Sequence, residues 1–141
     1  MKRVHILLVE DNEGDIVLTL NAFEESKIKS NISVVKNGKD ALDFLFQREE
    51  YKTAERPDLV LLDINIPIFN GHEVLKQIKE APTLKKIPVI MLTTSSSQKD
   101  IHTAYSNYGN SYVTKPIDMN DFIKAVLKIE EFWLQLSKLA T

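Results

Sequence analysis

The run Leu-Val-Leu-Leu-Asp at residues 59–63 constrains the fold of this chain more than any other stretch. Four consecutive apolar residues after Pro57 predict a strand that is buried on both faces, because a strand with one wet face would alternate apolar and polar residues. Such a strand belongs to a parallel sheet between two layers of helices. Ligands bind at the carboxyl ends of strands in these open sheets. Asp63 is therefore the first candidate for a functional residue.

Similar runs recur along the chain and alternate with segments of helical periodicity. Strands are expected at residues 4–9, 31–35, 59–63, 88–92 and 111–113, and helices from Glu13, after Gly38, from Gly71 to near Ala81, near residues 97–108 and at about 118–138. Five alternating units predict an α/β fold with a doubly wound parallel sheet, for which the commonest strand order is 2-1-3-4-5. A chain of 141 residues needs one core, so residues 1–141 are read as a single domain.

The apolar spacing also predicts which side of each element faces the core. In the first helix, Ile16, Leu20 and Phe23 mark the buried side, with Val17 expected beside them. The second helix is expected to carry Leu42, Leu45 and Phe46. The strand at residues 31–35 is more polar than the others, as an edge strand would be.

Composition excludes several classes of function. Lysine and arginine number 18 against 20 acidic residues, and this net charge of −2 gives no electrostatic case for binding nucleic acid. Cysteine is absent, which excludes disulfides and thiolate metal sites. The N-terminal apolar run is too short for a signal peptide or a membrane span, so a soluble, cytoplasmic protein without membrane contact is expected. His5, His72 and His102 have no spacing typical of a ligand pair and are interpreted as structural.

Polar side chains collect at one edge of the expected sheet. The order 2-1-3-4-5 brings Glu10 and Asp11 beside Asp63, while Thr93 and Lys115 leave the next two strands at the same edge. Three neighbouring carboxylates would repel one another unless a cation joined them. Because all these ligands are hard oxygens, the sequence predicts Mg²⁺ or Mn²⁺ rather than Zn²⁺.

Such a metal, an ammonium group and a hydroxyl group are what the oxygens of a transferring phosphoryl group require. Lys115 and Thr93 would supply the ammonium and the hydroxyl. Asp63 in their midst could act as a nucleophile and form an acyl phosphate.

These motifs, taken together, resemble the receiver domain of two-component response regulators. The resemblance rests on Val-Glu-Asp-Asn at 9–12, Leu-Leu-Asp-Ile-Asn-Ile-Pro at 61–67, Gly71, Pro-Val-Ile-Met-Leu-Thr at 88–93 and Tyr-Val-Thr-Lys-Pro at 112–116. It implies a flavodoxin-like (βα)5 fold and a phosphorylation-activated switch, in which a histidine kinase phosphorylates Asp63. By the same resemblance the protein is a signalling phosphoacceptor and not an enzyme that acts on external substrates.

The resemblance also implies roles for single residues around the metal and the phosphoryl group. Asp11, Asp63 and the backbone carbonyl of Asn65 would bind the metal, and Glu10 would act through a bound water. Thr93 would be the hydroxyl that moves toward the phosphoryl group, with which Lys115 would pair. Tyr112 would be an aromatic switch, and the bond between Lys115 and Pro116 would be cis.

Some features depart from the common pattern of the family. Glu10 replaces the more frequent aspartate, and Thr94 stands where a small residue is usual, so that its bulk could slow phosphoryl entry or water attack. The charged segment 48–56 and the Phe132-Trp133 pair look more like the small stand-alone regulators associated with phytochrome-like histidine kinases.

The last expected helix carries two apolar stripes where packing on one sheet needs a single stripe. Its second stripe and its end contain five apolar residues, Ile123, Leu127, Phe132, Trp133 and Leu134. This surface predicts a homodimer or a docking face for the kinase, so that the switch would act through protein contact.

Two other classes of function share parts of this pattern. A metal-dependent phosphatase or phosphotransferase with an aspartate nucleophile usually carries a second aspartate two residues later as general acid, where this chain has Asn65. A scaffold pseudo-receiver that works without phosphorylation would be expected to lack part of the acid and lysine set, and all of that set is present.

Overall fold

A parallel five-stranded sheet in the order β2-β1-β3-β4-β5 forms the centre of the molecule. The computed structural model describes residues 3–25, 29–93 and 112–114. The strands are β1 (Val4–Val9), β2 (Ser30–Val35), β3 (Leu59–Asp63), β4 (Val89–Thr93) and β5 (Tyr112–Thr114). All four neighbouring pairs are parallel. The predicted strand order and direction are therefore confirmed.

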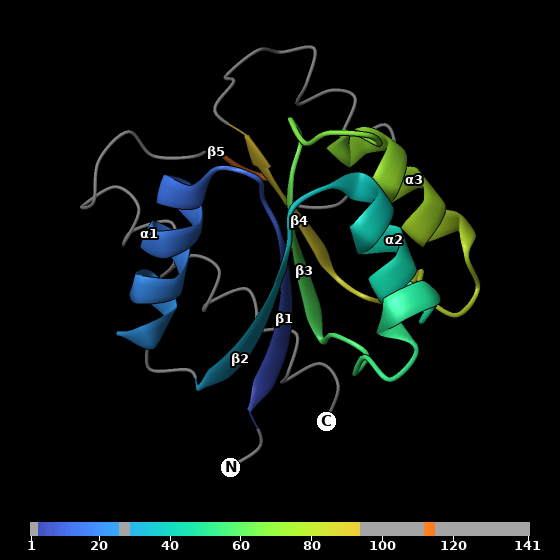
Figure 1. Cartoon of the computed structure of the whole chain (residues 1–141), viewed down its shortest axis with the longest axis horizontal. Coiled ribbons are helices and arrows are strands. Elements are labelled where there is room, and N and C mark those ends of the chain that lie inside the picture. The colour runs from blue at the N-terminus through green and yellow to red at the C-terminus, as the bar shows by residue number, and fades with distance from the viewer. Residues whose placement is uncertain (1–2, 26–28, 94–111, 115–141) are drawn as a thin grey trace.

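Helices cover both faces of this sheet. The described helices are α1 (Glu13–Glu24), α2 (Gly38–Leu45) and α3 (Gly71–Glu80), with a short 3-10 helix, η1 (Glu49–Tyr51), inside the segment expected as a charged connection. Helix α1 lies on one face, and α2 and α3 lie together on the other (Figure 1). The helices expected near residues 97–108 and 118–138 fall outside the described residues. The described part is a doubly wound sheet, as predicted.

The central strands are apolar throughout because each contributes to two cores. Leu7 and Val9 of β1 belong to the cluster under α2 and α3, whereas Ile6 and Leu8 belong to the cluster under α1. Every residue of β1 and of β3 is buried. The edge strand β2 is only partly buried along most of its length, which agrees with its polar sequence. Asp63 therefore ends a strand that is fixed from both sides.

Two apolar residues of the predicted helices are exposed to solvent. Val17 is 53% exposed, because the stripe of α1 that faces the sheet runs through Ile16 and Phe23 and turns Val17 toward solvent. Helix α2 ends at Leu45, so Phe46 lies beyond its last turn and is 36% exposed. The guanidinium of Arg48 stacks 4.8 Å from the centroid of the Phe46 ring. The predictions that Val17 lies on the same side of its helix as Ile16 and that Phe46 belongs to the second helix were wrong.

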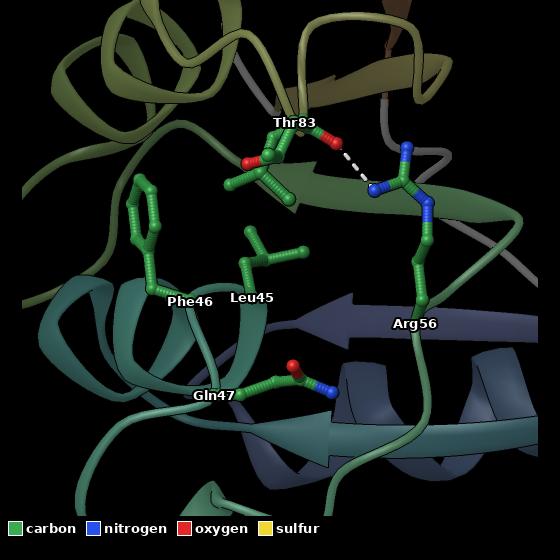
Figure 2. A pocket seen from close by; sticks show the side chains of 6 residues that line it. Leu45, Phe46, Gln47, Arg56 and Thr83 are labelled. Carbon is green, nitrogen blue, oxygen red and sulfur yellow. Dashed lines mark hydrogen bonds between the residues drawn. The ribbon is translucent and has the colours of Figure 1, made fainter.

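A pocket of about 210 Å³ opens beside Phe46 at the amino-terminal edge of the sheet. Figure 2 shows Phe46 and Arg56 on opposite sides of this pocket, with Leu45 between them, and the guanidinium of Arg56 donates a hydrogen bond to the carbonyl of Thr83. Arg56 precedes β3, and Asp63 ends it. The pocket and the acidic residues therefore lie at opposite ends of the same strand.

The structural interpretation of His5 is confirmed by its contacts. His5 is buried, its Nε2 lies 2.9 Å from the hydroxyl of Ser33, and its Nδ1 lies 3.3 Å from the carbonyl of Arg56. Its backbone N–H donates to the carboxylate of Asp58 over 2.9 Å.

None of the helices in the described ranges is long and apolar enough to cross a membrane.

Candidate functional site

The acidic residues meet where β1 and β3 end side by side. Val9 pairs with Leu62, so the next residue of each strand segment, Glu10 and Asp63, emerges at the same edge. Glu10, Asp11 and Asp63 each offer one carboxylate oxygen, and these three oxygens lie within 4.8 Å of one another. The sequence prediction that these three acids come together is confirmed.

Glu10 is almost completely buried, at 1% exposure. Its carboxylate bonds to the backbone of the next two residues. Its Oε2 accepts hydrogen bonds from the backbone N–H of Asp11 at 3.0 Å and of Asn12 at 3.3 Å. Its own N–H donates to the carbonyl of Val35 in β2 over 3.0 Å. The longer glutamate side chain is thus held at the turn, with a carboxylate oxygen close to those of the other two acids.

Asp63 is also buried, at 4% exposure. Its Oδ1 accepts a hydrogen bond of 3.0 Å from the backbone N–H of Asn65, and the N–H of Ile64 donates to the carbonyl of Leu92 over 3.0 Å. The register with β4 therefore continues past Asp63, and the carboxylate is oriented by the loop that follows it. A buried carboxylate with a fixed orientation is suited to react at one defined position.

Asp11 is the exposed member of the three acids. The cap of α1 is Asn12, whose side chain accepts from the N–H of Asp15 at 2.9 Å. Because Asn12 caps the helix, the carboxylate of Asp11 is not used as a cap and lies in the acidic cluster. This exposed carboxylate places one side of the cluster at the protein surface.

The donor atoms of this cluster fit a divalent cation that prefers oxygen. Within the described residues, the cluster contains no histidine, and its three carboxylate oxygens lie close enough to share one ion. Two of the three carboxylates are buried, where their mutual repulsion is least screened by water. A bound cation would offset this repulsion, so the residues present fit the metal predicted from the sequence.

The loop from β3 to α3 is packed very closely against Asp63. A Cβ atom on Gly71 would lie 2.5 Å from the carbonyl oxygen of Asp63, and the N–H of Gly71 donates to the carbonyl of Ile64 over 2.8 Å. Only a glycine allows the start of α3 to approach the strand this closely. Asn70 caps the helix by accepting from the N–H of Glu73 at 3.0 Å. These contacts hold the loop that carries Asn65.

Ile68, at the tip of this loop, has an unfavourable backbone conformation. Its φ is 72°, a region that β-branched residues rarely adopt, and its side chain is 66% exposed. We expect Ile68→Asn to stabilise the protein by about 1 kcal/mol, because asparagine tolerates positive φ and little apolar burial is lost. Urea denaturation would measure this as a higher midpoint with an unchanged slope.

Val17→Asn is the matched control for that substitution, because Val17 is also an exposed β-branched residue but lies in helical backbone. It should give no gain in stability, since asparagine and valine have similar helix propensities and the substitution relieves no positive φ there. Equal midpoints for wild type and Ile68→Asn would contradict the assignment of strain to Ile68.

Comparison with known proteins gives the same result as the geometry. The profile of the response regulator receiver domain matches residues 6–127. This chain belongs to the response regulator receiver domain family. The protein is accordingly a phosphorylation-activated switch of two-component signalling, and its fold is the flavodoxin-like fold that the resemblance implied.

The relatives of this receiver domain include response regulators that it matches over most of their length. The chain is 42% identical to the response regulator Rcp1 of Synechocystis sp. over 92% of its length and 88% of that protein. It is 45% identical to the probable methanogenesis regulatory protein FilR2 of Methanothrix harundinacea, over 92% and 83%. The crystal structure of the phosphorylated cyanobacterial phytochrome response regulator RcpA superposes with a TM-score of 0.89 at 44% identity, over 94% of this chain and 95% of RcpA.

The predicted residues on β4 and β5 can be placed only by their backbone. Thr93 is the last residue of β4, and it pairs with Thr114, the last residue of β5. Tyr112 begins β5. Thr94, Lys115, Pro116 and the apolar residues of the last expected helix, Ile123, Leu127, Phe132, Trp133 and Leu134, lie outside the described residues.

Gly38 is a residue of this receiver domain whose contact with the site the sequence did not predict. It is the first residue of α2, yet its N–H donates to the carbonyl of Pro67 in the β3–α3 loop over 3.1 Å. The available signal was a glycine inside the first turn of a helix, where it costs about 1 kcal/mol relative to alanine. Such a position is explained when another segment approaches the backbone closely.

Proposed function

We propose that Asp63 is the phosphoacceptor of this receiver domain and that it works with one divalent metal ion. Asp11, Asp63 and the backbone carbonyl of Asn65 would bind the ion, and Glu10 would hold it through a water. The observation that carries the proposal is the meeting of three carboxylate oxygens within 4.8 Å, one of them on the buried and oriented Asp63.

The chain itself would supply the nucleophile and its orientation. The Asn65 N–H donates to Oδ1 of Asp63 at 3.0 Å and fixes the orientation of the carboxylate. Burial keeps bulk water away from this carboxylate. A carboxylate oxygen of Asp63 would attack phosphorus and form a P–O bond, while the P–N bond to the histidine of the kinase breaks and the imidazole leaves with that electron pair. The bound metal would neutralise charge on the phosphoryl oxygens.

Residues at the ends of β4 and β5 would read the phosphorylated state. We assign Thr93 as the hydroxyl that binds a phosphoryl oxygen and Lys115 as the ammonium group that pairs with it. Thr94 would restrict access to the pocket, Tyr112 would change its position with Thr93, and a cis bond at Pro116 would set the path of the chain after Lys115. The backbone register that places residues 93 and 114 side by side supports these roles.

The metal is proposed to be Mg²⁺ or Mn²⁺. The ligand set consists of oxygens alone, which suits both ions. A structure of the Mn²⁺-bound form of Rcp1, 42% identical to this chain with a TM-score of 0.86 over 93% of it, supports the same assignment.

The kinase is proposed to be of the phytochrome-like class, because RcpA is a phytochrome response regulator. The output would be protein contact, which would include a homodimer through the second apolar stripe of the last expected helix. The chain aligns with nearly the whole of RcpA and most of Rcp1, which supports the comparison with these two response regulators. With this kinase as its partner, the protein is proposed to lie in the cytoplasm.

Incubation with acetyl phosphate tests the central proposal without the kinase. With Mg²⁺ present, intact-mass measurement should show one added phosphoryl group on the folded protein, because the carboxylate and its metal suffice for transfer from a small donor. A chelator should abolish the adduct. An unchanged mass in the presence of Mg²⁺ would contradict the proposal.

A further inference from the structure

The β3–α3 loop, residues 64–70, is held by backbone hydrogen bonds from two glycines. Gly71 donates to the carbonyl of Ile64 over 2.8 Å at the end of the loop, and Gly38 donates to the carbonyl of Pro67 over 3.1 Å near its middle. Between these two contacts Ile68 keeps its φ of 72°. A loop persists in such a conformation when its surroundings impose it.

The contact at Gly38 leaves no room for a side chain. A Cβ atom there would lie 2.1 Å from the carbonyl oxygen of Phe69, 2.7 Å from its Cβ and 2.8 Å from its carbonyl carbon. Two of these are backbone atoms, which cannot move aside as the end of a flexible side chain can. Any larger residue at position 38 must therefore displace the loop or the start of α2.

Gly38 is not required by its own backbone conformation. Its φ lies outside the left-handed region in which glycine is favoured, and it occupies the first turn of an ordinary helix capped by Asn37. An alanine would suit the helix itself better than glycine does. The reason for glycine at position 38 is therefore the loop that packs on it, and this loop contains Asn65.

We infer that Gly38 of α2 is a positioning residue for the metal site, acting through the β3–α3 loop on the Asn65 carbonyl. The inference rests on the proposed function, in which that carbonyl binds the ion. The Asn65 N–H also bonds to Oδ1 of Asp63 at 3.0 Å, so a displaced loop alters two of the three metal-binding groups at once. Outer partners that orient metal ligands typically change metal affinity by about 10- to 100-fold when they are mutated.

The test is the Mn²⁺ affinity of Gly38→Ala, measured by the electron paramagnetic resonance signal of free Mn²⁺. We expect the dissociation constant to rise by about 10-fold or more. Gly14→Ala is the matched control, because Gly14 is also in the first turn of a helix and its added Cβ would meet only the Asn12 side chain, at 3.3 Å. Its dissociation constant should stay within about twofold of the wild-type value, since a side-chain atom can give way.

A second readout separates positioning from folding. With acetyl phosphate as donor, Gly38→Ala should need about 10-fold more Mg²⁺ for half-maximal phosphorylation but should approach the wild-type rate at saturating Mg²⁺. Pro67→Ala loosens the same contact from the loop side without adding bulk to α2, and it should weaken Mn²⁺ binding in the same direction.

The outcomes distinguish this inference from the proposed function. If wild type binds Mn²⁺ and Gly38→Ala binds it with the same affinity, the role of Gly38 is wrong and the proposed metal site is still supported. Wild type that binds no Mn²⁺ would overturn both. If Gly38→Ala does not fold, unchanged Mn²⁺ affinity in Pro67→Ala would overturn the inference, and weakened affinity would support it.

Discussion

Replacement of Asp63 by asparagine is expected to abolish the phosphoryl adduct formed from acetyl phosphate and Mg²⁺. Asparagine has nearly the same shape, and its Oδ1 can still accept the Asn65 N–H that bonds to Asp63 at 3.0 Å. The amide is neutral, however, and cannot form an acyl phosphate by direct attack on phosphorus. Intact mass and the rate of adduct formation under identical conditions measure the loss.

Asp58→Asn provides the matched control at the other end of the same strand. Asp58 precedes β3, and its Oδ2 accepts from the backbone N–H of His5 at 2.9 Å. This substitution removes the same charge just before the same strand but leaves the acidic cluster intact, so the adduct should form as in wild type. An adduct that persists in Asp63→Asn would show that another residue is the acceptor.

The central strands were predicted well because a continuous apolar run between turn residues indicates a strand that is buried on both faces. Strands β1 and β3 have the predicted bounds, and both are fully buried. The strand order was predicted as 2-1-3-4-5 because this is the commonest order for five alternating units. Since order alone brings the ends of β1 and β3 together, the meeting of Glu10, Asp11 and Asp63 was also predictable.

The errors concern features that depend on neighbouring segments. Val17 is apolar and one position from the buried Ile16, so only the actual orientation of α1 decides that it faces solvent. Phe46 continues the apolar pattern of α2, but the helix stops at Leu45. Apolar periodicity gives the direction of a stripe and does not give its width or its last residue.

The close contacts of the β3–α3 loop could not be predicted for the same reason. Gly38 lies about thirty residues before the loop, and nothing local links the two. Its contact with Phe69 exists because α2 and α3 pack side by side on one face of the sheet (Figure 1). Likewise, the fold-back of the Glu10 carboxylate onto two backbone N–H groups depends on the exact turn between β1 and α1.

Replacement of Asp11 by asparagine should have opposite effects on stability with and without metal. Without metal, Asp11→Asn is expected to be more stable than wild type by about 1 kcal/mol, because it removes one of three negative charges whose oxygens lie within 4.8 Å. Asp11 is exposed, so solvent screens part of this repulsion and the gain stays small. Urea denaturation in the presence of a chelator measures it.

With Mg²⁺ the order should invert. A ligand that binds only the folded state at a concentration 100 times its dissociation constant stabilises by about 2.7 kcal/mol. If loss of a ligand carboxylate weakens binding about 100-fold, the same Mg²⁺ concentration stabilises Asp11→Asn by only about 0.4 kcal/mol. Wild type would then be the more stable protein, by about 1 kcal/mol.

Glu13→Gln separates this inversion from a general effect of charge near α1. Glu13 lies two residues after Asp11 and pairs with Lys36, outside the acidic cluster. Its replacement removes the same charge from the same region but should leave the full response to Mg²⁺, with a slight loss of stability in both conditions. A simple structural role of Asp11 would shift both denaturation curves in one direction. The stability order of wild type and Asp11→Asn reverses between the two conditions only if the carboxylate repels its neighbours without metal and binds the metal when it is present.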